Sequence, residues 1–242
     1  MSAAQARAVA SSGPPAIDWP GVEAGLNARG YAILPGLMAP ETCRGLAGLY
    51  AEDDRFRSRV VMQRHGFGRG EYKYFANPLP EPVAALRHAL YPRLAPIANR
   101  WNAALGEGGN FPAALDGYLA ECHAAGQTRP TPLLLKYETD DYNCLHQDLY
   151  GALVFPLQLT VVLSEPAVDF SGGEFLLVEQ RPRMQSRGEV VALGIGDAVV
   201  FAVHHRPVQG TRGVYRVNLR HGVSRLKAGR RFSLGIIFHD AA

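Results

Sequence analysis

The sequence predicts a mainly β chain with helices (α+β), in which a double-sheet jelly roll follows an N-terminal helical region. Two observations lead to this prediction. Runs with helix-like apolar spacing occur before Pro132, whereas short strand-like runs separated by Gly, Pro, Asp or Ser dominate after it. Eight such strand-like runs can be distinguished, which suits a jelly roll. An eight-stranded up-and-down barrel is the related alternative.

The region before the jelly roll is expected to be largely helical. Residues 20–30 have helix-like apolar spacing that ends at Gly30, and the strand-like run YAILP follows them. The next stretch, APETCRGLAGLYAEDD, places its apolar side chains on one helical stripe. Between residues 79 and 125 two more helical segments are expected, with breaks around Pro92, Pro96 and the turn GEGGNFP.

The strand-like runs supply the faces of the two sheets. In chain order they are PLLLKYE, NCLHQD, FPLQLTVVLSE, GEFLLVEQ, GEVVALG, DAVVFAV, YRVNLRHGVSRL and RRFSLGIIFH. Alternate residues of a strand point to opposite faces, so Arg231 and Ser233 share one face of the last run. Its other face carries apolar side chains that are expected to pack against the helices: Phe232, Leu234, Ile236 and Phe238.

Chain length, net charge and cysteine content limit the domain organisation and the class of protein. A chain of 242 residues suits a flexible tail at 1–16 and one domain at 17–242, divided into a helical region with a substrate lid at 17–131 and a jelly-roll core at 132–242. The net charge of +3 is too small to indicate a nucleic-acid binder by itself. No apolar run is long enough to cross a membrane. Three cysteines without a CxxC pair suit a reducing compartment, so we expect a cytoplasmic protein. We also expect a monomer or weak dimer.

The triplet His146-Gln147-Asp148 is a candidate metal site. With 8 His and 10 Asp in 242 residues, the number of H-x-D matches expected by chance is roughly one third. The triplet therefore needs further support. On a strand, residues two apart point to the same face, and a barrel can bring a third ligand from a distant strand. His221 is the preferred third ligand, and the pair His204–His205 is the alternative. Two histidines and one carboxylate leave positions open on the metal, unlike a closed structural zinc site.

A candidate anion anchor lies ten residues after His221. Arg231 and Ser233 share a strand face, where a guanidinium and a hydroxyl can hold a carboxylate through charge-assisted hydrogen bonds. The neighbouring Arg230 is the alternative, but strand alternation favours Arg231.

The ordered set H-x-D, H-x-V and G-x-R-x-S-L, with GGEF and GDAVVF between them, resembles the Fe(II)/2-oxoglutarate-dependent oxygenase superfamily over residues 132–239. The resemblance implies a double-stranded β-helix fold and a dioxygenase that uses Fe(II), 2-oxoglutarate and O2. It implies three iron ligands, His146, Asp148 and His221. It also implies that Arg231, assisted by Ser233, binds the distal carboxylate of 2-oxoglutarate, and that Tyr137 contacts this co-substrate.

A narrower resemblance concerns the substrate. KYETDDYNCLHQD and RHGVSRLKAG are similar to segments of AlkB-type dioxygenases, and the whole chain resembles a bacterial group assigned to oxidative demethylation of damaged nucleic acid. The chain departs from the AlkB pattern at two positions. Leu135 stands where that family has an asparagine, and Ile237 stands where it has a second arginine. The resemblance therefore implies DNA repair as one function, with alkylated nucleic acid as partner.

Residues 55–80 mix basic and aromatic side chains and are expected to form a substrate lid. Phosphates attract the basic groups and bases stack on aromatic rings, so the mixture also suits a nucleic-acid substrate. The lid candidates are Arg64, Arg69, Tyr72, Lys73 and Tyr74. Three alternatives stay open: hydroxylation of a peptide side chain or small metabolite, a cupin-like metal enzyme that ignores 2-oxoglutarate, and a non-catalytic binding module.

Overall fold

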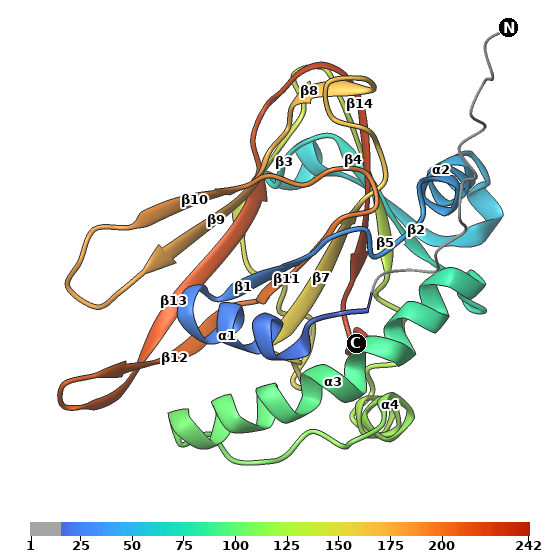
Figure 1. Ribbon diagram of the computed structural model, residues 1–242. Helices are drawn as coiled ribbons and strands as arrows, with labels where there is room; N and C mark the ends of the chain where they lie inside the picture. Colours follow the sequence, from blue (N-terminus) through green and yellow to red (C-terminus); the bar gives the residue numbers. More distant parts are fainter. Residues whose placement is uncertain (1–15) are drawn as a thin grey trace, which may run out of the picture.

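Two antiparallel sheets form the centre of the molecule in the computed structural model, which describes residues 16–242 (Figure 1). All but the last residue of the tail expected at 1–16 lies outside the described residues. The larger sheet has eight strands in the order β1-β11-β7-β14-β5-β4-β2, with β8 paired to β14. The smaller sheet has six, in the order β10-β9-β13-β6-β3, with β12 paired to β13. Two separate sheets confirm the jelly roll over the up-and-down barrel.

The two sheets draw their strands from the whole chain. The larger sheet contains β1 (Tyr31–Leu34), β2 (Phe56–Val61), β4 (Glu71–Phe75), β5 (Leu133–Glu138), β7 (Leu157–Val162), β8 (Phe170–Gly172), β11 (Ala198–Ala202) and β14 (Leu226–Ile236). The smaller sheet contains β3 (Gly68–Arg69), β6 (Tyr142–His146), β9 (Phe175–Gln180), β10 (Arg187–Val191), β12 (His205–Gly210) and β13 (Gly213–Val223). The N-terminal region therefore adds strands to both sheets as well as helices.

The helices lie mainly before the jelly-roll strands. They are α1 (Trp19–Arg29), α2 (Pro40–Gly48), α3 (Glu81–Leu105) and α4 (Leu115–Ala124), with short 3-10 turns η1 (Leu49–Ala51), η2 (Asp53–Arg55) and η3 (Met62–His65). Helix α1 begins where the Asp18 side chain accepts a hydrogen bond from the Gly21 amide at 3.1 Å, and it ends at Gly30, whose φ is 82°. Among the described helices, none has the length and apolar character to span a membrane.

Helix α3 corrects one expectation, because it runs unbroken through Pro92 and Pro96. Each internal proline removes a backbone hydrogen bond and costs about 3 kcal/mol. The flanking side chains are buried in the main hydrophobic core, including Leu90, Leu94 and Trp101. Their burial holds the helical path despite the prolines, since tertiary packing contributes more to helix stability than local propensity.

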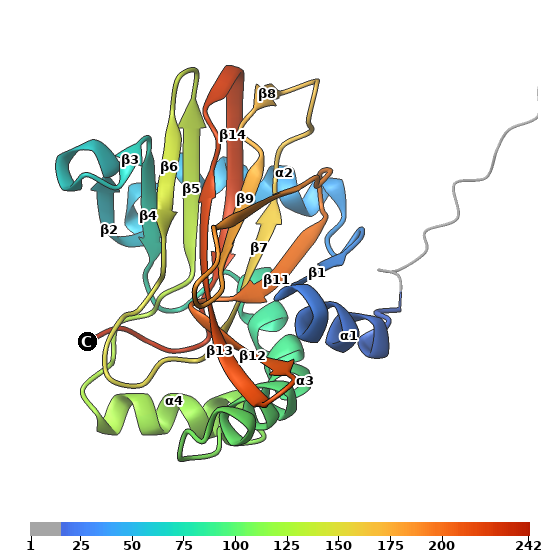
Figure 2. The ribbon, with the colours of Figure 1, turned by 90° about the vertical axis from the view of Figure 1, so that its left-hand side faces the viewer.

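The helices cover one face of the larger sheet, as expected from the alternation in the last strand. Leu234 and Ile236 of β14 belong to the same core cluster as α3 residues. On β7, Leu159 faces this core, whereas Gln158 and Thr160 line the cavity on the other face. In Figure 2, α3 and α4 cross below the sheets, and in Figure 1 the β9–β10 hairpin projects away from the helices, whereas β12 lies beside α1. The inner faces of the two sheets are therefore not covered by helices, and their side chains line a cavity.

Candidate metal centre and co-substrate pocket

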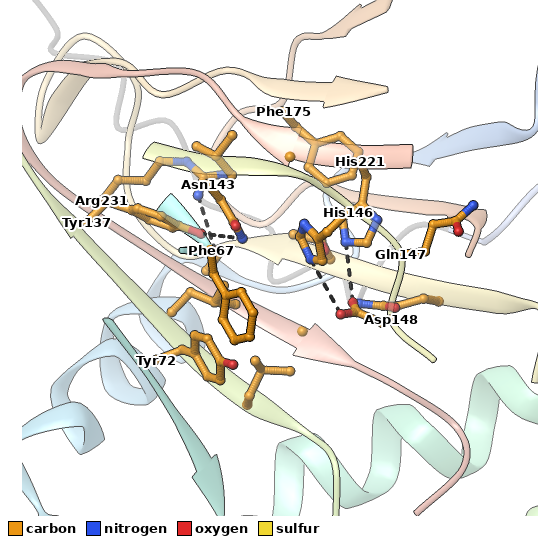
Figure 3. Close-up of a pocket in the computed structure, with 18 of the residues that line it drawn as sticks. Phe67, Tyr72, Tyr137, Asn143, His146, Gln147, Asp148, Phe175, His221 and Arg231 are labelled. Atoms are coloured by element: carbon orange, nitrogen blue, oxygen red, sulfur yellow. Dashed lines mark hydrogen bonds and ion pairs between the residues drawn. The ribbon is translucent and has the colours of Figure 1, made fainter. Parts of the chain in front are cut away.

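Three ligand-type side chains converge between the sheets (Figure 3). His146 ends β6 and lies directly opposite His221 of β13 in the strand register. Asp148 lies beyond the end of β6, so its position depends on the segment after the strand rather than on the strand alternation that the sequence suggested. Its Oδ1 lies 3.4 Å from His146 Nε2, and its Oδ2 lies 3.3 Å from His221 Nε2. The three ligand atoms all lie within 4.8 Å of one another.

The donor set fits a divalent metal. The carbonyl oxygen of Cys144 lies 2.8 Å from His146 Nδ1, so a proton on Nδ1 leaves Nε2 free to bind a metal. Two imidazole nitrogens and one carboxylate are the ligands of the facial triad that holds Fe(II). Within residues 16–242, no fourth His, Cys, Asp or Glu joins this group. The arrangement therefore leaves coordination positions open for reactants, as a catalytic metal site requires.

The protonation states of the three residues favour metal binding. Burial raises the pKa of Asp148, but hydrogen bonds with His146 and His221 outweigh burial and hold this pKa well below its ordinary value. Burial and the charge of His146 lower the pKa of His221. Burial also lowers the pKa of His146, yet its contacts with Asp148 raise it overall. The low pKa of Asp148 keeps its carboxylate ionised, and the lowered pKa of His221 favours the neutral imidazole that a metal ligand requires.

A cavity of about 200 Å³ adjoins the three residues and contains the predicted anion anchor. Arg231 is only 1% exposed, and its Nη1 donates to Ser233 Oγ at 3.2 Å. Among the described residues, no acidic side chain forms an ion pair with it. A buried cation without a charged partner is costly, so the site suits an anionic ligand. In contrast, the side chain of Arg230 is 62% exposed and pairs with Glu138 at 3.2 Å.

Tyr137 completes this end of the cavity. It lies opposite Arg231 in the β5–β14 register, and the Arg231 guanidinium is 5.6 Å from its ring centre. Burial raises the pKa of Tyr137 to about 12, so its hydroxyl keeps its proton and can donate a hydrogen bond. Asn143 donates to this hydroxyl at 3.4 Å and also lines the cavity. The structure thus brings together Arg231, Ser233 and Tyr137 beside the metal-ligand cluster.

The five lid candidates occupy different surroundings. Tyr72 lines the cavity, and the ring of Tyr74 packs edge to face on the ring of Tyr72, with 5.4 Å between the ring centres. Arg64 is exposed in η3, and the exposed Arg69 lies 3.3 Å from Asp141. Lys73 is buried, contacts Asp53 at 2.5 Å and lines a separate surface cleft. Of the five candidates, Tyr72 therefore has the direct route to a substrate in the cavity.

The structure also adds residues to the site beyond the predicted candidates. Phe67, an aromatic residue of the predicted lid segment, is 48% exposed and lies beside Tyr72 at the cavity (Figure 3). Tyr150 donates to Asp148 Oδ1 at 2.7 Å. Gln158 is buried in the cavity lining, and its Oε1 has no hydrogen-bond partner among the described residues. A polar residue inside the apolar run FPLQLTVVL was the available signal for Gln158, and proximity to the H-x-D triplet was the signal for Tyr150.

A jelly roll that holds two histidines, a carboxylate and a buried arginine around one cavity defines the class of Fe(II)- and 2-oxoglutarate-dependent oxygenases. The sequence places the chain within this class, because the model of the Oxygenase-NA family matches residues 70–241. The chain belongs to that family, which is described as oxygenases catalysing oxidative methylation of damaged DNA. The predicted superfamily, the predicted enzyme class and the predicted cofactors, Fe(II) and 2-oxoglutarate, are confirmed.

Two sequence relatives and two solved structures are similar to the chain. Two proteins described as uncharacterized, from two strains of Mycobacterium tuberculosis, are each 55% identical over 190 residues, which cover 78% of this chain and 79% of theirs. A Pseudomonas putida prolyl-4-hydroxylase shares the fold with a TM-score of 0.54 and 15% identity, covering 93% of this chain and 99% of its own. A Burkholderia pseudomallei oxidoreductase of the 2OG-Fe(II) oxygenase family gives a TM-score of 0.53 at 18% identity, covering 93% of each chain.

Proposed function

We propose that His146, Asp148 and His221 hold Fe(II), and that Arg231, Ser233 and Tyr137 hold the distal carboxylate of 2-oxoglutarate. The convergence of the three ligand atoms within 4.8 Å supports the first assignment. The buried guanidinium without an acidic partner among the described residues supports the second. Fe(II) with bound 2-oxoglutarate supplies the oxidising power that inserts one atom of O2 into a C–H bond, as succinate and CO2 form.

Different residues around the cavity have different roles in the proposed reaction. Arg231 and Ser233 orient the co-substrate by a charge-assisted contact in a site from which water is largely excluded. Tyr137 donates from its protonated hydroxyl and fixes the same end of the molecule. Phe67 and Tyr72 also line the cavity. Tyr72 lies opposite Leu135 in the same sheet as Arg231, so the two aromatic rings can orient a substrate next to the co-substrate anchor.

For the prime substrate, we favour a nucleobase that carries an N-methyl group in DNA. The family description carries this choice, and the exposed ring of Phe67 beside Tyr72 supports it, because aromatic faces stack on bases. Hydroxylation of an N–CH3 group gives N–CH2OH, which releases formaldehyde and leaves N–H. Oxidative chemistry at such a carbon therefore removes the methyl group and restores the base.

A peptide or small amine is the second candidate substrate, and the ion pairs made by the basic residues of the segment 55–80 favour it. Arg59 contacts Glu71, Arg69 contacts Asp141 and Lys73 contacts Asp53. These pairs neutralise much of the positive charge that the sequence offers for phosphate contacts, and phosphate contacts dominate the affinity of most nucleic-acid binders.

Formaldehyde and succinate release distinguish these candidates. The enzyme should release both in equal amounts from N-methylated single-stranded DNA, and neither product should rise above background with the unmethylated strand. The Phe67→Ala variant should raise KM for the methylated strand without changing KM for 2-oxoglutarate. Stimulation by methylated amines or peptides, with none by methylated DNA, would reject the nucleic-acid proposal and favour the second candidate.

A further inference from the structure

Tyr150 directs its hydroxyl at the carboxylate of the metal-ligand cluster. The hydroxyl donates to Asp148 Oδ1 at 2.7 Å, and Asp148 itself is buried. A tyrosine hydroxyl has an ordinary pKa of about 10, so it is protonated at neutral pH and can donate. A hydroxyl that donates to a buried carboxylate forms a charge-assisted hydrogen bond, which is stronger than a neutral one.

This hydrogen bond makes the two oxygens of Asp148 different. Oδ1 accepts from Tyr150 and lies 3.4 Å from His146 Nε2. Oδ2 lies 3.3 Å from His221 Nε2, and no hydroxyl among the described residues donates to it. Oδ2 therefore keeps both lone pairs available for a metal, whereas one lone pair of Oδ1 is occupied by the Tyr150 hydroxyl.

The chain around Tyr150 fixes the position of its hydroxyl. Gln127 Nε2 donates to the carbonyl oxygens of Tyr150 at 3.2 Å and of Leu153 at 3.0 Å. The ring of Tyr74 meets the Tyr150 ring edge to face at 6.3 Å. Gly151 has a φ of 107°, and a Cβ added there would lie 2.4 Å from the Gln127 side chain. Tyr150 is therefore supported on its ring and its backbone.

We infer that Tyr150 is a positioning residue that keeps Asp148 attached to the metal through one oxygen. A metal held by two histidines and one carboxylate would keep positions open for 2-oxoglutarate and O2. A second oxygen from Asp148 would occupy one of these positions. The inference rests on the proposed role of Asp148 as a metal ligand, and it assigns to the Tyr150 hydroxyl the task of protecting that position.

The Tyr150→Phe variant tests this role, because it removes the hydroxyl and keeps the ring. Co(II) serves as the metal probe, since its visible absorption depends on coordination number. The variant should still bind Co(II), but the spectrum of its Co(II)–2-oxoglutarate complex should differ from that of the unchanged protein. With Fe(II), kcat for succinate formation should fall about 10- to 100-fold, the usual effect of removing a partner of a metal ligand. KM for 2-oxoglutarate should stay close to its original value.

Tyr91→Phe is the matched control. Tyr91 is fully buried, and its hydroxyl has no hydrogen-bond partner within the described chain, so its loss should change neither spectrum nor kcat. An unaltered spectrum and kcat in Tyr150→Phe would overturn the inference. A crystal structure of the Co(II)-loaded unchanged protein adds a test that does not depend on the variant's folding, because Asp148 bound through both oxygens would also overturn it. Undiminished Co(II) binding by Asp148→Ala would instead reject the metal assignment itself.

Discussion

Arg230 and Arg231 are adjacent in the chain but lie in opposite surroundings. Arg230 points to solvent beside Glu138, whereas Arg231 points into the cavity, where burial lowers its pKa. The guanidinium remains charged even so, because arginine has a very high ordinary pKa. Strand alternation alone separates the two residues, and this is why the choice between them could be predicted from the G-x-R-x-S-L pattern.

We predict that Arg231→Met raises KM for 2-oxoglutarate, because the variant lacks the charge that holds the distal carboxylate. Hydrogen bonds to charged groups contribute about 1.5–3 kcal/mol, which corresponds to an increase of about 10- to 100-fold. Steady-state succinate formation against 2-oxoglutarate concentration measures the effect. Arg230→Met is the matched control and should leave KM unchanged, and an equal rise in both variants would contradict the assignment of Arg231.

Other residues of the site could not be predicted, because their roles depend on contacts that no local pattern encodes. Tyr150 lies in an irregular segment after β6, and its hydrogen bond to Asp148 depends on how that segment turns. Lys73 was predicted as a lid residue that could contact substrate, yet the fold buries it against Asp53 and the carbonyl oxygen of Tyr50.

At the scale of elements, the segment between β6 and β7 carries Asp148 and Tyr150 without regular structure of its own. Gln127, just after α4, holds this segment by donating to two of its carbonyl oxygens and accepting from the Leu153 amide at 2.7 Å. The same side chain donates to the Asp240 carbonyl oxygen at 2.7 Å. One buried amide thus joins a helix end, the ligand-bearing segment and the C-terminal residues.

We predict that Gln127→Leu lowers the free energy of unfolding by about 3 kcal/mol, since it leaves several buried backbone groups without partners. Urea denaturation of the metal-free protein measures this loss. The variant should also bind Co(II) more weakly, because the segment that carries Asp148 loses its support. Gln209→Leu, at an exposed position of β12, is the control, and similar stability of both variants would rule out a supporting role for Gln127.

The elements themselves were predictable where the pattern was local. The strand-like runs after Pro132 and the cap at Gly30 correspond to observed elements. The continuity of α3 was not predictable, because Pro92 and Pro96 are helix breakers by local criteria and only burial against the sheet outweighs them. Residues 55–80, whose composition indicated a lid or an edge strand followed by a lid, form the strands β2, β3 and β4.

At the scale of the whole molecule, the jelly roll explains how residues far apart in sequence reach one cavity. Strand β6 pairs with β13 and β5 pairs with β14, so both the metal-ligand cluster and the anion anchor combine early and late strands. The helices cover the outer face of the larger sheet and leave its inner face to line the cavity. The site therefore depends on the pairing of early strands with late ones.

Buried histidines make the stability of this fold sensitive to acid. Burial, with a contribution from the charge of Arg87, lowers the pKa of His239 to about 4, whereas an unfolded chain has a histidine pKa of about 6.5. Between these values the unfolded state binds a proton that the folded state does not. The stability from a neutral His239 is therefore complete above pH 6.5 and decreases as pH falls towards 4, by up to about 1.4 kcal/mol per pH unit.

We predict that His239→Gln flattens this pH dependence. The Phe155 amide donates to His239 Nδ1 at 3.2 Å, and a glutamine oxygen can accept the same hydrogen bond without titrating. Urea unfolding of the metal-free protein between pH 7 and 5 measures the slope, with the exposed His65→Gln as control. A slope in His239→Gln as steep as in the unchanged protein would show that His239 does not cause it.

Anomalous X-ray diffraction at the manganese absorption edge, from a crystal soaked with Mn(II) and 2-oxoglutarate, examines the metal assignment without relying on activity. We expect one strong peak between His146 Nε2, His221 Nε2 and Asp148, with 2-oxoglutarate extending from it towards Arg231. A peak at His204 and His205, or density for 2-oxoglutarate away from Arg231, would contradict the assignment.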